Sequence, residues 1–262
     1  MAVSGHYMAW RVRGSAIPYV KAYGEFVLKD VLSAFANLGN RADEIAKAEF
    51  NRLASELVGE ESSSDMASLA ESAFKEGLAF YETRSSLRQT ILNLLAEGLF
   101  HLIEQHLADL CHDETFSEMN VPPPSETNLE SVRKWYQAYF YLDLSSLPSW
   151  RKIDELRLVA NATKHGKGHS ADELLQVRPD LFQLPPLPEE IPLNISSPHI
   201  SEELLKVWME KTIVMPLAGP VLHGLYVTEQ LFGEYYQSGN QLFADIANHF
   251  EAHGEKYYPF AG

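Results

Sequence analysis

The chain has 262 residues, 45% of them hydrophobic, and a formal net charge of -15. This length is sufficient for one large buried core or for two packed cores. The acidic balance opposes non-specific binding to DNA and to anionic membranes. It favours small-molecule or protein partners unless a basic patch is locally concentrated.

The cysteine content and the hydropathy of the chain further restrict the class of protein. Cys111 is the only cysteine, which excludes an intramolecular disulfide and a cysteine-based zinc site. The N-terminal MAVSGHYMAWRVRGS lacks the continuous apolar run of a signal peptide, and no stretch of about 18 uncharged apolar residues could span a membrane. We therefore expect a cytoplasmic protein with no membrane association and no cofactor.

The first half of the chain is predicted to be helical. Apolar positions recur at three- and four-residue steps over 18–58 and again over 66–111, where a bend or short loop is expected near 83–86. The segment LRQTILNLLAEGLFHLIEQHLADL is apolar around much of its circumference, so it is predicted to be the central, most buried helix. HYMAWRVRG, residues 6–14, is the only modest strand candidate.

The second half of the chain continues with helices separated by proline. The consecutive prolines of NVPPPSETN predict a loop. After this loop, helices are expected over 127–142 and over a segment that contains 155–165. A short helix follows, with Ser170 as its N-cap and Glu173 three residues farther on. The last two helices are expected over 201–237, with interruptions at Pro216 and Pro220, and over 240–253. The fold class is therefore all-α. We expect a helical bundle over 1–182, a Pro-rich connector over 183–199, and a C-terminal helical segment over 200–262 packed on the bundle.

The stretch ELRLVANATKHGKGH, residues 155–169, carries an unusual polar row. On a helix, residues four apart differ by only about 40° around the axis. One face of this helix therefore carries Arg157, Asn161 and His165, with Lys164 beside them. The neighbouring stripe is expected to face the core: Ile153, Leu156, Ala160 and Thr163. The polar row therefore lies at the edge of the buried face, where side chains can be ordered and still reach a ligand.

This stretch is also locally basic. Residues 151–169 hold five basic side chains and two acidic ones, a local charge of +3 in a chain of -15, which suits an anionic ligand. A structural explanation remains open beside this one. Gly166 and Gly168 are typical of a helix end, and Lys164 and His165 in a last turn suit the helix dipole.

An Arg and a His on one helical face can bind and cleave a phosphodiester. His165 would act as general base or acid, and Arg157 would stabilise charge on the phosphate. Asn161 would orient the substrate or the imidazole, and Lys164 and Lys167 would steer the phosphate.

The segment resembles the HEPN superfamily. These are small all-helical domains, many of them metal-independent ribonucleases of bacterial defence and toxin–antitoxin systems. Their signature is an Arg, often followed by Asn, Asp or His, and a His four to six residues on. NATKH supplies Asn161 and His165 at that distance, Ala160 occupies the place of the Arg, and Arg157 is the nearest upstream Arg. The resemblance implies a HEPN-like bundle, an RNA or nucleotide ligand and a homodimer.

The wider sequence around this segment also resembles a family of uncharacterised bacterial helical proteins. That family carries both the LNLLAEGLFHLIEQHL and the ELRLVANATKHG blocks. This resemblance implies nothing further about activity.

A second polar stripe runs along the predicted central helix. Its members are Asn93, Glu97, His101 and Glu104. Buried polar groups need partners. In one interpretation, Glu97 and Glu104 support the site by pairing with Arg157, Lys164 or His165. In another, Glu97, His101 and Glu104 bind a metal. His101 taken alone is typical of a hydrogen-bonded core histidine.

Two alternatives to an RNA-acting protein remain open. One is a non-catalytic interaction subunit, antitoxin-like or part of a complex, in which the basic row pairs with the chain's own acids. The other is a metal-binding helical-bundle enzyme, for which Asp245, His249 and His253 also have a suitable spacing. We expect no metal at the candidate site itself.

Overall fold

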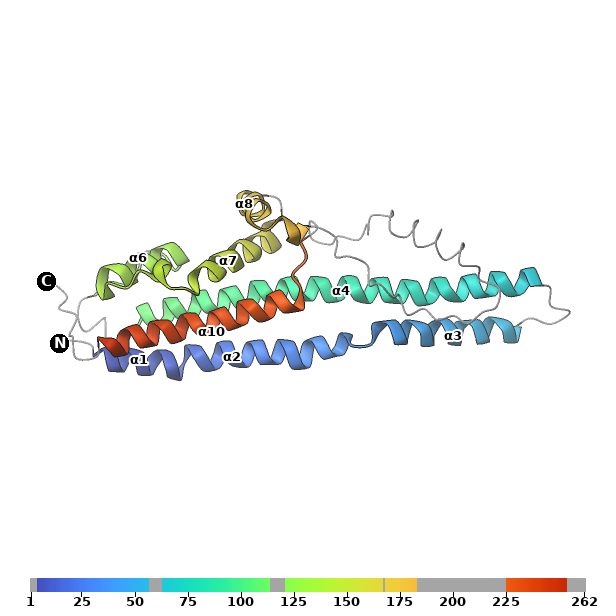
Figure 1. Ribbon diagram of the computed structural model, residues 1–262, viewed down its shortest axis with the longest axis horizontal. Coiled ribbons are helices and arrows are strands. Elements are labelled where there is room, and N and C mark those ends of the chain that lie inside the picture. The colour runs from blue at the N-terminus through green and yellow to red at the C-terminus, as the bar shows by residue number, and fades with distance from the viewer. Residues whose placement is uncertain (1–3, 57–62, 114–120, 167, 183–224, 254–262) are drawn as a thin grey trace. The chain divides into compact units, whose positions relative to one another are not determined.

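The computed structural model describes residues 4–56, 63–113, 121–166, 168–182 and 225–253. Within these ranges the chain is helical and forms no strand, which confirms the all-α prediction (Figure 1). The elements are α1 (Gly5–Gly14), α2 (Ala16–Phe26), a π-helical turn η1 (Val27–Val31), a 3-10 turn η2 (Leu32–Phe35), α3 (Leu38–Glu56), α4 (Ser63–Cys111), α6 (Leu129–Phe140), a 3-10 turn η3 (Leu144–Ser146), α7 (Trp150–His165), α8 (His169–Val177), a 3-10 turn η4 (Pro179–Phe182) and α10 (Glu229–Ala252).

The described residues belong to two compact units. The first contains α1, α2, the part of α4 from Leu92 onward, α6, α7, α8 and α10. The second contains α3 and the part of α4 up to Ile91. The predicted connector 183–199 and the helical segment predicted up to residue 224 lie outside the described residues.

The strand expected over 6–14 is wrong, because this segment is α1. Its buried positions are Gly5, Met8, Ala9 and Val12, which is the three-and-four spacing of a helix and not the alternation of a strand. The hydroxyl of Ser4 accepts a hydrogen bond from the backbone N–H of His6 and caps the first turn.

Four other predictions about helix boundaries also differ from the structure. The helix expected over 18–58 is divided between α2 and α3, and Asn37 adopts a positive φ of 58° just before α3 begins. The loop or bend expected near 83–86 is absent, since α4 is helical throughout, and α10 continues without a break at Gly239. Ser170 is not an N-cap, because α8 begins at His169 and Gly168 occupies the cap.

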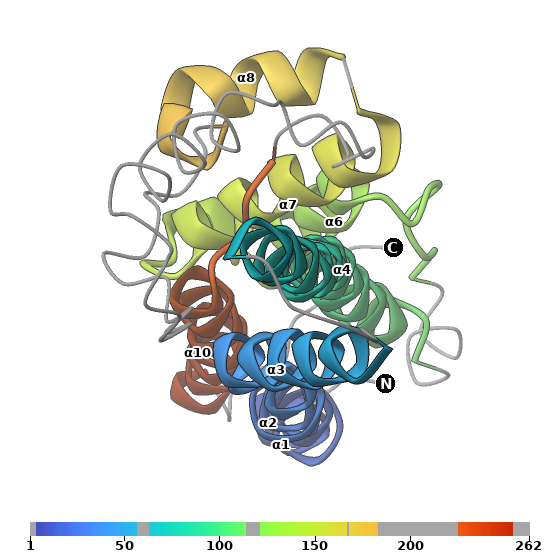
Figure 2. The same cartoon turned by 90° about the vertical axis from the view of Figure 1, so that its right-hand side faces the viewer.

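The core of the first unit is formed by helices around the second half of α4. α10 packs against α1, α2 and α7. α6 and α7 lie on one side of α4, and α1 and α2 lie on the other (Figure 2). The second half of α4 is buried as predicted, and it contributes the fully buried Leu92, Leu99, Ile103 and Leu107.

Close approach of the helices requires small residues. A Cβ placed on Gly24 of α2 would lie 2.1 Å from the ring of Tyr236 on α10. The hydroxyl of Tyr23 donates to the carbonyl of Leu95 on α4 (2.9 Å), and burial raises the pKa of this phenol to about 12. Helix α2 therefore packs closely against α10 at Gly24 and is hydrogen-bonded to α4 through Tyr23.

Asn93, the first member of the polar stripe on α4, has a structural role. Its Nδ2 donates to the carbonyl of Leu225 (2.7 Å), and its Oδ1 accepts from the N–H of Val227 (3.1 Å). Both backbone groups belong to the segment that leads into α10. The buried amide of Asn93 therefore provides hydrogen-bond partners for the backbone of that segment where it enters the core.

α7 confirms the predicted stripe and the predicted helix end. Ile153, Leu156, Ala160 and Thr163 are all buried. The helix ends at Gly166, which has a positive φ of 66° and donates its N–H to the carbonyl of Ala162 (2.9 Å).

The second unit pairs α3 with the first half of α4 through small residues. A Cβ on Gly77 would lie 2.7 Å from the carbonyl oxygen of Ala42, so this position admits only glycine without a shift of the backbone. The guanidinium groups of Arg41 and Arg84 both lie over the ring of Phe80. Among the described residues of the whole chain, the helices lack the length and apolarity needed to cross a bilayer.

Candidate functional site

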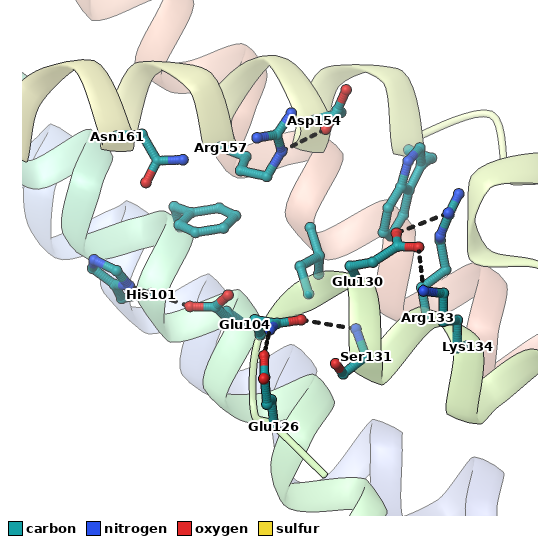
Figure 3. A pocket seen from close by; sticks show the side chains of 14 residues that line it. His101, Glu104, Glu126, Glu130, Ser131, Arg133, Lys134, Asp154, Arg157 and Asn161 are labelled. Atoms are coloured by element: carbon teal, nitrogen blue, oxygen red, sulfur yellow. Dashed lines mark hydrogen bonds and ion pairs between the residues drawn. The ribbon is translucent and has the colours of Figure 1, made fainter. Parts of the chain in front are cut away.

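A hollow of about 750 Å³ opens between α4, α6 and α7 in the first unit. Figure 3 shows polar side chains along its walls. The lining residues are Phe100, His101 and Glu104 of α4; Glu126 and Asn128 before α6; Leu129, Glu130, Ser131, Arg133 and Lys134 of α6; and Trp150, Asp154, Arg157 and Asn161 of α7.

The α7 wall holds an arginine fixed at one nitrogen. Nε of Arg157 donates to Oδ1 of Asp154 (2.7 Å), and 29% of the Arg157 side chain is exposed. No partner among the described residues meets its two terminal nitrogens or the side-chain amide of Asn161, one turn farther along. Figure 3 shows this amide on the hollow side of α7. The wall therefore presents free hydrogen-bond donors to a ligand.

The α6 wall carries an ion-pair cluster of one acid and two bases. Glu130 pairs with Arg133 (2.8 Å) and with Lys134 (3.2 Å). Hydrogen bonds from Arg133 and then Lys134 hold the pKa of Glu130 below its usual value. Asn128 caps α6 by accepting from the N–H of Ser131 (2.9 Å), which fixes the start of this wall beside the hollow.

The α4 wall is built around His101. Its Nδ1 lies 3.4 Å from Oε2 of Glu104, and its Nε2 lies 3.8 Å from Oε1 of Glu97. Nearly half of the imidazole is exposed, with 47% of the side chain accessible, so the expectation of a buried core histidine is wrong. A second hollow of about 500 Å³ shares His101 and Glu104 and continues along α4 to Asp109 and His112.

His165 and Lys164 lie elsewhere on α7. Both are exposed in its last turn and do not line either hollow, and Lys167 lies outside the described residues. Eight helical steps separate Arg157 from His165, a rise of about 12 Å at about 1.5 Å per residue. The structure thus brings Arg157 and Asn161 together with His101 and leaves His165 outside the hollow.

The expected pairing of Glu97 and Glu104 with the α7 row is absent among the described residues. Both carboxylates instead flank His101 of their own helix. Glu104 still faces the same hollow as Arg157 and Asn161, whereas Glu97 does not line it.

An ion-pair network centred on Glu155 was not predicted. This carboxylate accepts from Arg178, which follows α8, from the hydroxyl of Tyr235 on α10 (2.8 Å) and from Lys152 (3.3 Å). Burial, and then the charge of Glu155, raise the pKa of Tyr235 well above its usual value, so this phenol remains a donor. Lys152 also meets Glu234 of α10 (3.1 Å). The sequence indicates only the Lys152–Glu155 spacing, because the other partners are distant in the chain.

The alternative metal spacing on α10 has other contacts in the structure. Nε2 of His249 lies 3.3 Å from the carbonyl of Phe140, and burial lowers the pKa of His249. Nδ1 of His253 lies 2.7 Å from the carbonyl of His249, and Asp245 accepts from Gln241 (2.7 Å). Across the described ranges, no three His, Cys, Asp or Glu side chains converge in a way that could hold a metal ion.

Comparison with protein-family models, with curated proteins and with solved structures gives no match to this chain.

Proposed function

We propose that this protein binds single-stranded RNA or a nucleotide in the α4–α6–α7 hollow, with a phosphate against Arg157 and the amide of Asn161. The observation that carries the proposal is the state of Arg157. Arg157 lines the hollow, Asp154 holds its Nε, and its two terminal nitrogens have no partner among the described residues. A guanidinium with two free terminal nitrogens can bind two phosphate oxygens at once.

Other features of the hollow support an RNA ligand. Trp150 lines it beside Asp154 and Arg157, and an aromatic side chain offers a stacking surface for a base. Asn161 offers both a donor and an acceptor, which is what hydrogen bonding to a base edge requires.

The resemblance of NATKH to the HEPN signature supports the same proposal. On this basis we propose a role in a bacterial defence or toxin–antitoxin system, with a homodimer as the functional form. Within one chain, binding is better supported than cleavage by His165, because His165 does not line the hollow.

Fluorescence anisotropy with a labelled single-stranded RNA tests the proposal. Arg157→Gln is expected to weaken binding about tenfold or more, because a hydrogen bond to a charged group contributes about 1.5–3 kcal/mol. Arg151→Gln is the matched control: it makes the same change on an exposed residue of α7 that does not line the hollow. No binding by the wild-type protein, or equal losses in both variants, would overturn the proposal.

The second candidate is a non-catalytic interaction subunit. It is favoured by the pairing of basic residues with the chain's own acids, as in Lys152 with Glu155 and Arg157 with Asp154. In that case Arg157 is a scaffold residue, and its replacement would lower the melting temperature of a protein that binds no RNA.

A further inference from the structure

Among the described residues that line the α4–α6–α7 hollow, Glu104 is the most enclosed carboxylate. Its side chain is 24% exposed, whereas those of Asp154 and Glu130 are 44% and 54% exposed. Glu126, which also lines the hollow, is exposed and accepts a hydrogen bond from the side-chain amide of Asn128. A partly enclosed negative charge is costly unless a counter-charge or hydrogen-bond donors meet it.

The partners of these carboxylates differ as well. Asp154 is paired with an arginine, and Glu130 is paired with two cations of its own helix. Among the described residues, Glu104 meets only the imidazole of His101, whose Nδ1 lies 3.4 Å from Oε2. An imidazole, unlike Arg or Lys, is not a permanent cation. Glu104 therefore keeps acceptor capacity that a ligand in the hollow can use.

Two walls of the hollow thus offer a ligand opposite chemistry. Free donors lie on α7, at Arg157 and Asn161, and a free acceptor lies on α4, at Glu104 (Figure 3). A phosphate is attracted by a guanidinium and repelled by a carboxylate. In a nucleotide bound with its phosphate against Arg157, the group suited to the α4 wall is therefore the base.

Guanine is the base whose Watson–Crick edge matches a carboxylate. Its N1–H and its N2 amino group lie side by side and can donate one hydrogen bond to each carboxylate oxygen. Adenine and cytosine each place an acceptor nitrogen beside their amino group, and uracil flanks its one N–H with two carbonyl oxygens. An acceptor placed against a carboxylate is repelled, so these three bases are disfavoured.

We propose that the hollow selects guanine and that Glu104 determines this specificity, an inference that rests on the proposed binding of RNA or a nucleotide. Oε1 of Glu104 accepts from one donor of the base, and Oε2 accepts from the other. Each carboxylate oxygen has two lone pairs, so Oε2 can retain its contact with His101.

Competition in the fluorescence anisotropy assay tests the inference. Unlabelled GMP, AMP, CMP and UMP are titrated against labelled single-stranded RNA bound to the wild-type protein. GMP is expected to displace the RNA at a concentration about tenfold or more below that of the other three, which is the discrimination typical of one bidentate contact to a base. Inosine 5′-monophosphate, which lacks the N2 amino group, is expected to fall between GMP and AMP.

Two matched substitutions on α4 test the role of Glu104. Glu104→Gln replaces one acceptor oxygen with an amide donor, so the preference for GMP over AMP should fall about tenfold or more. Glu97→Gln is the control, because Glu97 flanks the same imidazole and does not line the hollow; this variant should keep the preference. Far-UV circular dichroism verifies that both variants are folded, and the comparison of nucleotides on the wild-type protein needs no variant.

The outcomes separate the two proposals. A preference for GMP that is lost in Glu104→Gln and kept in Glu97→Gln supports the inference. Equal displacement by the four nucleotides, equal displacement by GMP and inosine 5′-monophosphate, or a preference that survives in Glu104→Gln would each overturn the inference and leave RNA binding intact. Failure of the wild-type protein to bind the labelled RNA would overturn the proposed function itself.

Discussion

His106 differs from the other histidines of α4 in its surroundings. Its ring lies 5.4 Å from that of Tyr19 and 6.3 Å from that of Phe243, and its buried Nε2 has no hydrogen-bond partner among the described residues. Burial lowers the pKa of His106 below 6.5, although the charge of Asp109 opposes this effect. The side chain of His106 therefore packs against aromatic rings of α2 and α10.

This environment predicts a loss of stability in weak acid. The folded-state pKa of His106 is lower than its usual value of 6.5, so the unfolded chain takes up the proton first as the pH falls. The contribution of neutral His106 to the free energy of unfolding is therefore complete above about pH 6.5. It is lost progressively as the pH falls through the folded-state pKa. Denaturant titrations between pH 8 and pH 5 should show this decline, and His106→Phe should make it shallower.

The control for this prediction is His169→Phe, a change at an exposed histidine of α8. It should leave the pH dependence unaltered. Because burial also lowers the pKa of His249, some acid sensitivity should persist in His106→Phe. If His106→Phe retains the full wild-type slope between pH 7 and pH 5, titration of His106 does not contribute to stability.

At the scale of the element, sequence periodicity predicted the buried faces and misjudged the helix boundaries. The stripes of α7 and of the second half of α4 repeat strongly enough to be recognised from the sequence. The breaks at η1 and around Asn37 lie where the chain passes from the first unit to the second, and the local sequence contains no clear signal for them. α1 was mistaken for a strand because exposed bulky residues such as Trp10, which is 65% exposed, obscure the helical spacing of its buried residues Met8, Ala9 and Val12.

The candidate site was predicted in part, for a similar reason. The row from Arg157 to Asn161 follows from helical geometry, and the structure places both residues at the hollow. The wall formed by α6, and the position of His101 across from α7, depend on packing between segments far apart in the chain. No pattern within one segment could indicate those contacts.

Helix packing predicts opposite effects for two glycines. Gly24→Ala should destabilise the protein, because the new Cβ would lie 2.1 Å from Cδ2 and 2.4 Å from Cγ of Tyr236, and overpacking costs about 1–3 kcal/mol. Gly233→Ala on α10 meets nothing within 4 Å and should stabilise the helix by about 0.5–1 kcal/mol. Denaturant unfolding measures both free energies, and a stabilising Gly24→Ala would show that Tyr236 yields without cost.

At the scale of the whole molecule, the net charge of -15 limits how an RNA can bind. A long nucleic acid that lay across the surface would be repelled by most of it. Among the described residues that line the hollow, the cations are Arg157, which is paired with Asp154, and Arg133 and Lys134, which share Glu130. We therefore expect contact with very few phosphates.

The salt dependence of binding measures that number directly. For single strands, the logarithm of the association constant falls with the logarithm of the salt concentration by about 0.7 for each phosphate contacted. Contact with one to three phosphates predicts a slope between about -0.7 and -2, and Arg157→Gln should reduce its magnitude by about 0.7. A much steeper slope would indicate a broad basic surface, and a slope unchanged in Arg157→Gln would show that this guanidinium does not meet a phosphate. Because the slope counts phosphates and does not depend on the total affinity, it separates recognition at this hollow from non-specific adsorption, which the charge of the chain otherwise opposes.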